Sequence, residues 1–185
     1  MKKLIDLFNA QSLCSFVDYV SFGKKAEKLI DENKLSIDKK IRIAILASST
    51  LNGVKEVLLA QCCAINVYTE LYLAEYGQYA QEIYNPKSGL YASNPDLIII
   101  NIDIRTIAAD YFFLPYNRSI SERKDWASET AHFLSGLALE AVGESSAKII
   151  LHNLEVPDYS SLGIMENKEE YGFVESIEDV NKILR

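Results

Sequence analysis

Four clusters of polar side chains suited to chemistry each follow an apolar run of the sequence. The clusters are Ser48, Ser49 and Thr50; Gly77 and Gln78; Asp103 and Arg105; and His152 and Asn153. A serine activated by histidine attacks carbonyl carbons, and nearby N–H or cationic groups stabilise the charge that then develops on the carbonyl oxygen. These residue types therefore raise the question of a serine nucleophile, but on their own they do not specify a reaction.

The apolar runs are typical of strands that are buried on both faces of a parallel sheet. We expect strands at 41–47, 65–70, 96–102 and 147–151, with helices at 52–63 and 119–142 between them. Alternating strands and helices predict an α/β fold. The expected architecture is a doubly wound, mostly parallel sheet of about four to five strands in a flavodoxin-like three-layer sandwich.

In such a sheet, ligands bind outside the carboxyl ends of the strands, near the point where the strand order reverses. All four polar clusters follow an expected strand. We therefore expect one shared surface at that edge of the sheet.

Residues 1–40 are expected to form an N-terminal helical lead-in, ahead of an α/β domain at 41–185. Apolar residues recur at near-helical spacing from Leu4 to Val20, and a second short helix is expected from Lys24 to Glu32. The Asp- and Glu-containing tail after Glu166 is expected to be a solvated helix face.

Composition excludes several classes of function. The chain has 185 residues, a hydrophobic content of 49% and a formal net charge of -7. This acidic balance argues against nucleic acid or an anionic membrane as the main partner. Asp6 and Asn9 interrupt the apolar region that a signal peptide needs, so we expect a cytoplasmic protein. No run approaches the ~18 apolar residues of a membrane span.

Cysteine usage gives no sign of a metal site. Cys14, Cys62 and Cys63 have neither metal-ligand spacing nor the even count of a disulfide framework, and we expect buried thiols. We expect no metal and no cofactor in this domain.

Four segments together resemble the N-terminal domain of FkbH-like proteins, which are members of subfamily IIIC of the HAD superfamily. They are "RIAILASSTLNG", "EYGQYAQEI", "SGLYASNPDLIIINIDIR" and "IILHNLEVP", and the resemblance covers about residues 41 to 185. It implies an SGNH-hydrolase-like fold, followed in the full protein by a HAD domain that binds magnesium. It also implies transfer of a glyceryl unit to the phosphopantetheine arm of an acyl carrier protein.

The resemblance suggests roles for single residues. An SGNH hydrolase has its nucleophilic serine after the first strand, and Ser49 takes that place here. Gly77 falls where a glycine oxyanion donor is expected, whereas Arg105 replaces the asparagine donor. The expected substrate-binding residues are Ser48, Thr50, Gly77, Gln78, Asp103, Arg105 and Asn153.

The general base is harder to assign, because neither histidine lies in a late Asp-x-x-His. His132 falls inside an expected helix, where an isolated histidine is usually structural. His152 follows a strand end and is the better candidate. Alternatively, Ser48, Ser49 and Thr50 cap the following helix, which we favour. Asp103 and Arg105 form either a salt bridge or a binding pair.

Three functions remain open. The favoured one is an accessory domain of an FkbH-like HAD-type enzyme, which works with its own HAD domain and an acyl carrier protein. The alternatives are a stand-alone SGNH-type esterase or acyltransferase that uses Ser49, and a structural or dimerisation domain whose partner would be a second copy in a homodimer.

Overall fold

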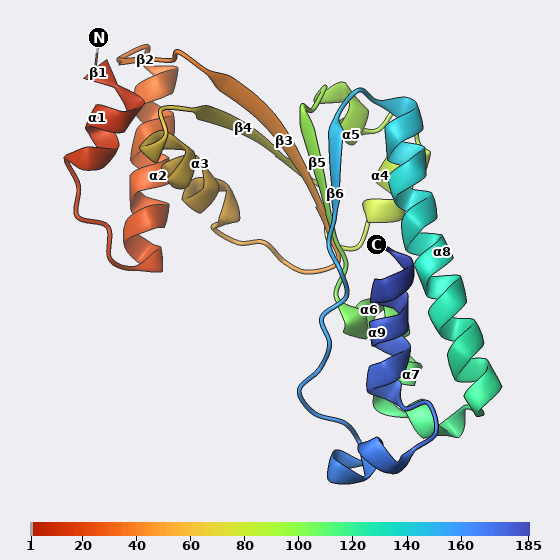
Figure 1. The fold of residues 1–185 in the computed structure, drawn as a ribbon. Helices are drawn as coiled ribbons and strands as arrows, with labels where there is room; N and C mark the ends of the chain where they lie inside the picture. Colours follow the sequence, from red (N-terminus) through yellow and green to blue (C-terminus); the bar gives the residue numbers. More distant parts are fainter. Residues whose placement is uncertain (1) are drawn as a thin grey trace.

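The computed structural model describes residues 2–185, and its centre is a four-stranded parallel sheet (Figure 1). The strands are β3 (Lys40–Ala47), β4 (Tyr68–Leu73), β5 (Leu97–Asn101) and β6 (Lys148–Leu151), in the order β4-β3-β5-β6. The chain forms β4 on one side of β3 and then returns past β3 to form β5 and β6. The strand order therefore reverses between β3 and β5. The predicted doubly wound α/β fold is confirmed.

Helices cover both faces of this sheet, which gives three layers (Figure 1). One face carries α1 (Leu4–Asn9), α2 (Phe16–Asp31) and α3 (Val54–Ala64). The other carries α4 (Tyr79–Tyr84), α5 (Gly89–Ala92) and α8 (Ile120–Glu144), whereas α9 (Phe173–Ile183) packs on α8 beyond the carboxyl ends of the strands (Figure 1). Shorter connections are α6 (Ile104–Ala108), α7 (Asp110–Phe113), and the 3-10 turns η1 (Pro115–Asn117) and η2 (Gly163–Lys168). A two-residue strand β1 (Lys2–Lys3) pairs with β2 (Leu35–Ser36).

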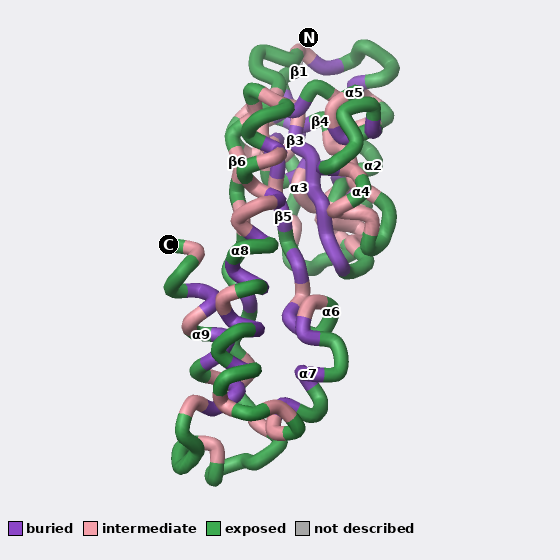
Figure 2. Tube along the Cα trace, turned by 90° about the vertical axis from the view of Figure 1, so that its right-hand side faces the viewer, coloured by how far each residue is buried: buried purple, intermediate pink, exposed green. Residues whose placement is uncertain are grey.

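Strand β3 lies inside the sheet, between β4 and β5, and its second half is apolar on both faces. Residues 43–47 are all buried, and Figure 2 shows this continuous buried stretch. Its even-numbered residues, Ala44 and Leu46, belong to a large core that also contains Leu134 and Leu137 of α8. A strand that packs on both faces has no polar side to turn to solvent, which explains the unbroken apolar run in the sequence.

A second, smaller core lies between the lead-in helices and α3. It contains Leu4 of α1, Phe22 and Ala26 of α2, and Leu59 and Cys63 of α3. A side chain at Gly23 would collide with the backbone of α3, so α2 and α3 approach each other closely there. The lead-in therefore packs on the α/β unit through α3.

The lead-in helices differ from the expected boundaries. A single helix, α2, replaces the expected short helix from Lys24, because Ser15 starts a helix eight residues earlier than expected. The Ser15 hydroxyl accepts a hydrogen bond from the Asp18 N–H, and the Asp18 carboxylate accepts one from the Ser15 N–H. This reciprocal pair is a capping box, which satisfies two free N–H groups at the helix start.

Two other local expectations were wrong. Strand β4 begins at Tyr68, three residues later than expected, because Asn66 takes the left-handed backbone conformation and turns the chain after α3. Cys14 is exposed, since it lies in the loop between α1 and α2. Cys63 is buried as expected, and burial raises the pKa of its thiol to about 12.

The acidic tail is more than a solvated helix face. Helix α9 buries Phe173, Ile177 and Val180 in the large core, against α8. Its acidic residues lie on the opposite side, where Glu178 is exposed. Among residues 2–185, no helix combines the length and the apolar character that crossing a bilayer requires.

Replacing Ile177 tests how much α9 contributes to the fold. Ile177→Ala removes a fully buried side chain from the large core, and we expect it to lower the free energy of unfolding by about 2–5 kcal/mol. The matched control, Glu178→Ala on the exposed side of α9, is expected to change it by about 0.5 kcal/mol or less. Urea denaturation of both variants measures the difference. Equal stabilities would show that α9 does not belong to the cooperative core.

Candidate functional site

The carboxyl ends of all four strands meet along one edge of the sheet, where backbone hydrogen bonds join their loops. The Gly77 N–H donates to the Ala47 carbonyl at 3.4 Å, and the Ser48 N–H donates to the Asn101 carbonyl at 3.2 Å. The His152 N–H donates to the Ile100 carbonyl at 2.9 Å. These contacts line up the four polar clusters in the order of the strands, across the point where the strand order reverses.

Ser48 joins the two central strands at this edge. Its side chain is buried, and its hydroxyl oxygen accepts a hydrogen bond from the Asp103 N–H at 2.7 Å. The Asp103 carboxylate in turn accepts the Arg105 N–H at 2.7 Å and caps the first turn of α6. The Ser48 hydroxyl is therefore committed to the fold.

The turn after β3 leaves the next two hydroxyl residues, Ser49 and Thr50, exposed. The prediction that these residues cap the following helix was wrong. Helix α3 starts only at Val54, and its N-cap is Gly53, whose φ of 79° lies in the left-handed region. The intervening turn moves the hydroxyl groups away from the first free N–H groups of the helix.

Neither histidine reaches Ser49 through a hydrogen bond within residues 2–185. The His132 Nδ1 lies 2.7 Å from the Ser128 carbonyl oxygen, one turn earlier in α8, as in a structural helix histidine. His152 is exposed after β6, which is separated from β3 by β5. Two strand spacings amount to about 10 Å, whereas proton transfer needs about 3 Å. A serine–histidine pair is therefore not formed in this arrangement.

Arg105 lies in an aromatic setting that the sequence did not reveal. The Arg105 guanidinium carbon is 5.6 Å from the centre of the Phe112 ring, which belongs to α7. Contact with the Tyr159 hydroxyl raises the pKa of this guanidinium, and nearby Asp103 and Glu155 act in the same direction. Phe112 and Tyr159 also contact each other edge to face, at 6.4 Å between ring centres.

A small cavity of about 50 Å³ lies beside the Arg105 side chain and is also lined by Asp103, Glu155 and Tyr159. Within residues 2–185, the Arg105 guanidinium forms no ion pair, so a salt bridge with Asp103 is not present. An arginine has five N–H donors in a planar fork that suits carboxylate and phosphate groups. Arg105 is the cationic side chain in the lining of this cavity, which also includes the carboxylates of Asp103, Glu155 and Asp158.

The loops after β4 and β6 complete the edge. Gly77 has a φ of 71° and open space around its Cα, so the backbone there is accessible. Gln78 is used locally, because its side-chain nitrogen donates to the Glu75 carboxylate at 3.1 Å. Asn153 is exposed, and the following residue, Leu154, is held in place by two hydrogen bonds of 2.8 Å with the Asn181 side chain.

The loop that carries Tyr159 is anchored by Glu166. The Glu166 carboxylate accepts hydrogen bonds from the Ser160 and Tyr116 hydroxyls and, at 3.0 Å, from the Val174 N–H. Burial alone would raise its pKa, but these donors outweigh burial, so the pKa lies below the usual value of 4.5. The carboxylate is thus charged at neutral pH and fixes the segment between β6 and α9.

Within 2–185, no three His, Cys, Asp or Glu side chains lie close enough together to hold a metal ion.

Comparisons with known proteins agree with this architecture. The model of the family "FkbH, N-terminal domain" matches residues 42–185, which is more than half of the chain. The chain belongs to the FkbH N-terminal domain family. No curated protein matches it. Its first residues, up to Ile41, lie outside the family match, although α1 and α2 pack on the family domain through α3.

A solved structure shares the fold of this FkbH N-terminal domain. It is described as the N-terminal part of the protein BF1531 from Bacteroides fragilis, containing a phosphatase domain complexed with Mg. The TM-score is 0.68, the sequence identity is 19%, and the match covers 92% of this chain. The chain spans only 41% of the length of that structure.

Removal of the Ser48 hydroxyl tests its role in the fold. Ser48→Ala leaves the partly buried Asp103 N–H without its acceptor, and we expect a loss of about 1–3 kcal/mol in the free energy of unfolding. The matched control is the adjacent, exposed Ser49→Ala, for which we expect a change of about 0.5 kcal/mol or less. Chemical denaturation measures both. A Ser48 variant as stable as the control would contradict the structural role.

Proposed function

We propose that this chain is the accessory, ligand-binding domain of an FkbH-like HAD-type enzyme. It would take part in glyceryl or acyl transfer to an acyl carrier protein, while a HAD domain elsewhere in the full protein would hold the magnesium ion. Membership of the FkbH N-terminal domain family supports this assignment. The solved structure with the same fold contains a phosphatase domain, which is consistent with such a partnership.

The observation that carries the proposal is the position of Arg105. Its guanidinium lies at the carboxyl edge of the sheet, against Phe112 and Tyr159 and without an ion-pair partner in the described residues. The phosphopantetheine arm of a carrier protein carries a phosphate and a long, flexible thiol-ended chain. Arginine binds the phosphate through charge-assisted hydrogen bonds, and the open backbone at Gly77 leaves room for the chain to lie along the edge.

A second function, an SGNH-type esterase or acyltransferase, has one observation in its favour. Ser49 is exposed directly after β3, at the point where the strand order reverses. Against it stands the missing hydrogen bond to a histidine. A serine hydroxyl without an adjacent base is a poor nucleophile, so we rank this function second.

Binding of a carrier protein tests the first proposal. We expect the chain to bind a phosphopantetheine-loaded acyl carrier protein and Arg105→Ala to weaken this binding about tenfold or more, since a hydrogen bond to a charged group contributes about 1.5–3 kcal/mol. Titration calorimetry measures the affinity. Lys148→Ala removes a positive charge at the opposite edge of the sheet and should leave binding unchanged. Equal affinities for the Arg105 and Lys148 variants would count against the proposal.

Labelling with a serine-reactive fluorophosphonate separates the two functions. For a ligand-binding domain we expect no adduct in the intact mass of the folded protein, because no base activates Ser49. An adduct that Ser49→Ala abolishes would favour the hydrolase instead. An adduct that remains in Ser49→Ala would arise elsewhere and would not support a nucleophilic role for Ser49.

A further inference from the structure

Strand β4 is an edge strand with one free side. It pairs with β3 from Lys40–Tyr68 to Ile45–Leu73, and no strand within residues 2–185 lies on its other side. Its sequence, "YTELYL", contains no proline, glycine or lysine, and Glu70 is its single charged residue. Natural proteins usually protect an edge with such residues or cover it. Strand β4 therefore has a backbone that is suited to pairing with a further strand.

Hydrogen bonds to β3 show which backbone groups are free. The Tyr68 N–H donates to the Lys39 carbonyl at 2.9 Å, and the Ala74 N–H donates to the Ile45 carbonyl at 3.1 Å. Because backbone groups alternate along a strand, the even-numbered residues of β4 bond to β3. The N–H and C=O groups of Thr69, Leu71 and Leu73 therefore point away from the sheet.

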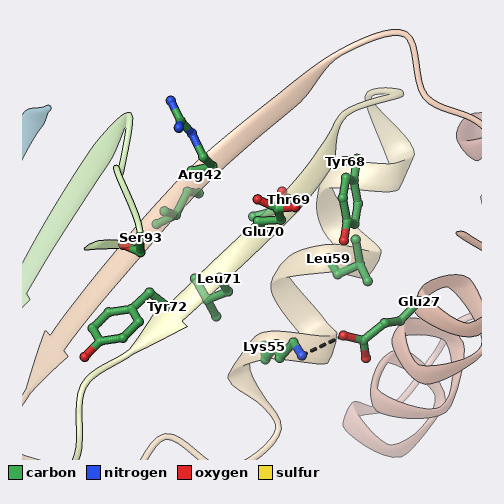
Figure 3. Close-up of a pocket in the computed structure, with 11 residues that line it drawn as sticks. Glu27, Arg42, Lys55, Leu59, Tyr68, Thr69, Glu70, Leu71, Tyr72 and Ser93 are labelled. Atoms are coloured by element: carbon green, nitrogen blue, oxygen red, sulfur yellow. Dashed lines mark ion pairs between the residues drawn. The ribbon is translucent and has the colours of Figure 1, made fainter. Parts of the chain in front are cut away.

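A groove of about 320 Å³ follows this free edge (Figure 3). Leu59 and Lys55 of α3 line one side of it, together with Glu27 of α2, whose carboxylate is 2.6 Å from the Lys55 amine. Arg42 of β3 and Ser93, which follows α5, line the other side. The groove thus runs between the two helical layers beside Leu71, which is partly exposed, whereas Thr69 is buried.

The charges along the groove favour one kind of partner. Its charged residues are Glu27, Glu70, Arg42 and Lys55, two of each sign. The chain as a whole carries a net charge of -7, which opposes the approach of another copy over most of the surface. At this groove Lys55 pairs with Glu27 and Arg42 pairs with Asp96 of the same chain, so the groove is locally neutral and does not repel a second copy. A strongly acidic or strongly basic partner would find no opposite net charge in this groove.

We propose that the β4 groove binds a second copy of this chain. The two β4 strands pair antiparallel around a two-fold axis at Leu71, so that the two sheets continue as one. In this register Leu71 lies opposite Leu71 of the other copy, and Thr69 lies opposite Leu73. The outward N–H and C=O groups then form a regular antiparallel ladder, and Glu70 lies opposite Tyr72 rather than another carboxylate.

Sedimentation equilibrium of the whole chain measures this association, from about 1 to about 200 µM. We expect a concentration-dependent dimer. Leu71→Pro removes an outward N–H at the two-fold axis and none that bonds to β3, so we expect the dimer Kd to rise about tenfold or more while the monomer stays folded. A chain that is monomeric throughout the range overturns the proposal.

A charge exchange provides a second test that leaves the strand intact. Lys55→Glu makes the groove acidic in both copies and is expected to raise the dimer Kd, most strongly at low salt. The double variant Glu27→Lys/Lys55→Glu restores the charge balance and is expected to bring the Kd back to near that of the unmodified chain. A dimer that is unaffected by Leu71→Pro and by Lys55→Glu forms elsewhere and overturns the proposal.

Hydrogen exchange locates the interface directly. The amides of Leu71 and Leu73, which are partly exposed, are expected to exchange rapidly in dilute protein and to become protected as the dimer forms. The amide of Tyr72, which faces β3, should be protected at every concentration. Outward amides that exchange equally fast in monomer and dimer would contradict the self-pairing proposal. So would amides that become protected only when a peptide from another protein is added, and not when the concentration of this chain is raised.

Discussion

The pairing of β3 with β5 is the constraint on which the rest of the structure depends. Side chains fix this pair at both ends. At the start, the Arg42 guanidinium bonds to both oxygens of the Asp96 carboxylate, and the backbone groups of the two residues bond to each other at 2.8 Å. At the other end, the Ser48 hydroxyl accepts the Asp103 N–H. Two contacts thus fix the register of β3 and β5. The strand order reverses between these two strands, so their pairing sets the positions of the loops at the carboxyl edge.

The Arg42–Asp96 pair also shows how much an exposed ion pair can do. Exposed pairs contribute little to stability, about 0–1 kcal/mol. Here the guanidinium is bidentate and the same carboxylate accepts the Arg42 N–H, which holds the pKa of Asp96 below its usual range. Its main effect is on alignment, because a slip of one residue would break both the Arg42–Asp96 pair and the Ser48–Asp103 hydrogen bond at the other end of the two strands.

The sequence was sufficient for the parts of the fold that rest on local pattern. The apolar run of β3 and the long helix α8, which begins at its Ser119 cap, were predicted within about two residues. Local pattern failed where a single backbone conformation decides the boundary. Asn66 delays β4, and Gly53 caps α3 in place of the hydroxyl residues, because only the folded turn shows which residue takes a left-handed conformation.

The site shows the same division. That polar residues follow each strand was visible in the sequence, and parallel topology then brings them to one edge. The aromatic surroundings of Arg105 were not visible, because Phe112 and Tyr159 come from α7 and from the loop after β6, and tertiary packing alone brings them together. The distance of His152 from Ser49 likewise depends on strand order, which one sequence does not specify.

The presence of two separate cores has a consequence for the motions of the molecule. The smaller core is formed by α1, α2 and α3, whereas the larger one lies on the other side of the sheet, against α8 and α9. Local opening of a protein proceeds through units that share a core. The lead-in helices can therefore detach as one cooperative unit while the β3–β5 pair and the larger core stay intact. When the smaller core opens in this way, the carboxyl ends of β5 and β6 stay folded, because these strands pack in the larger core.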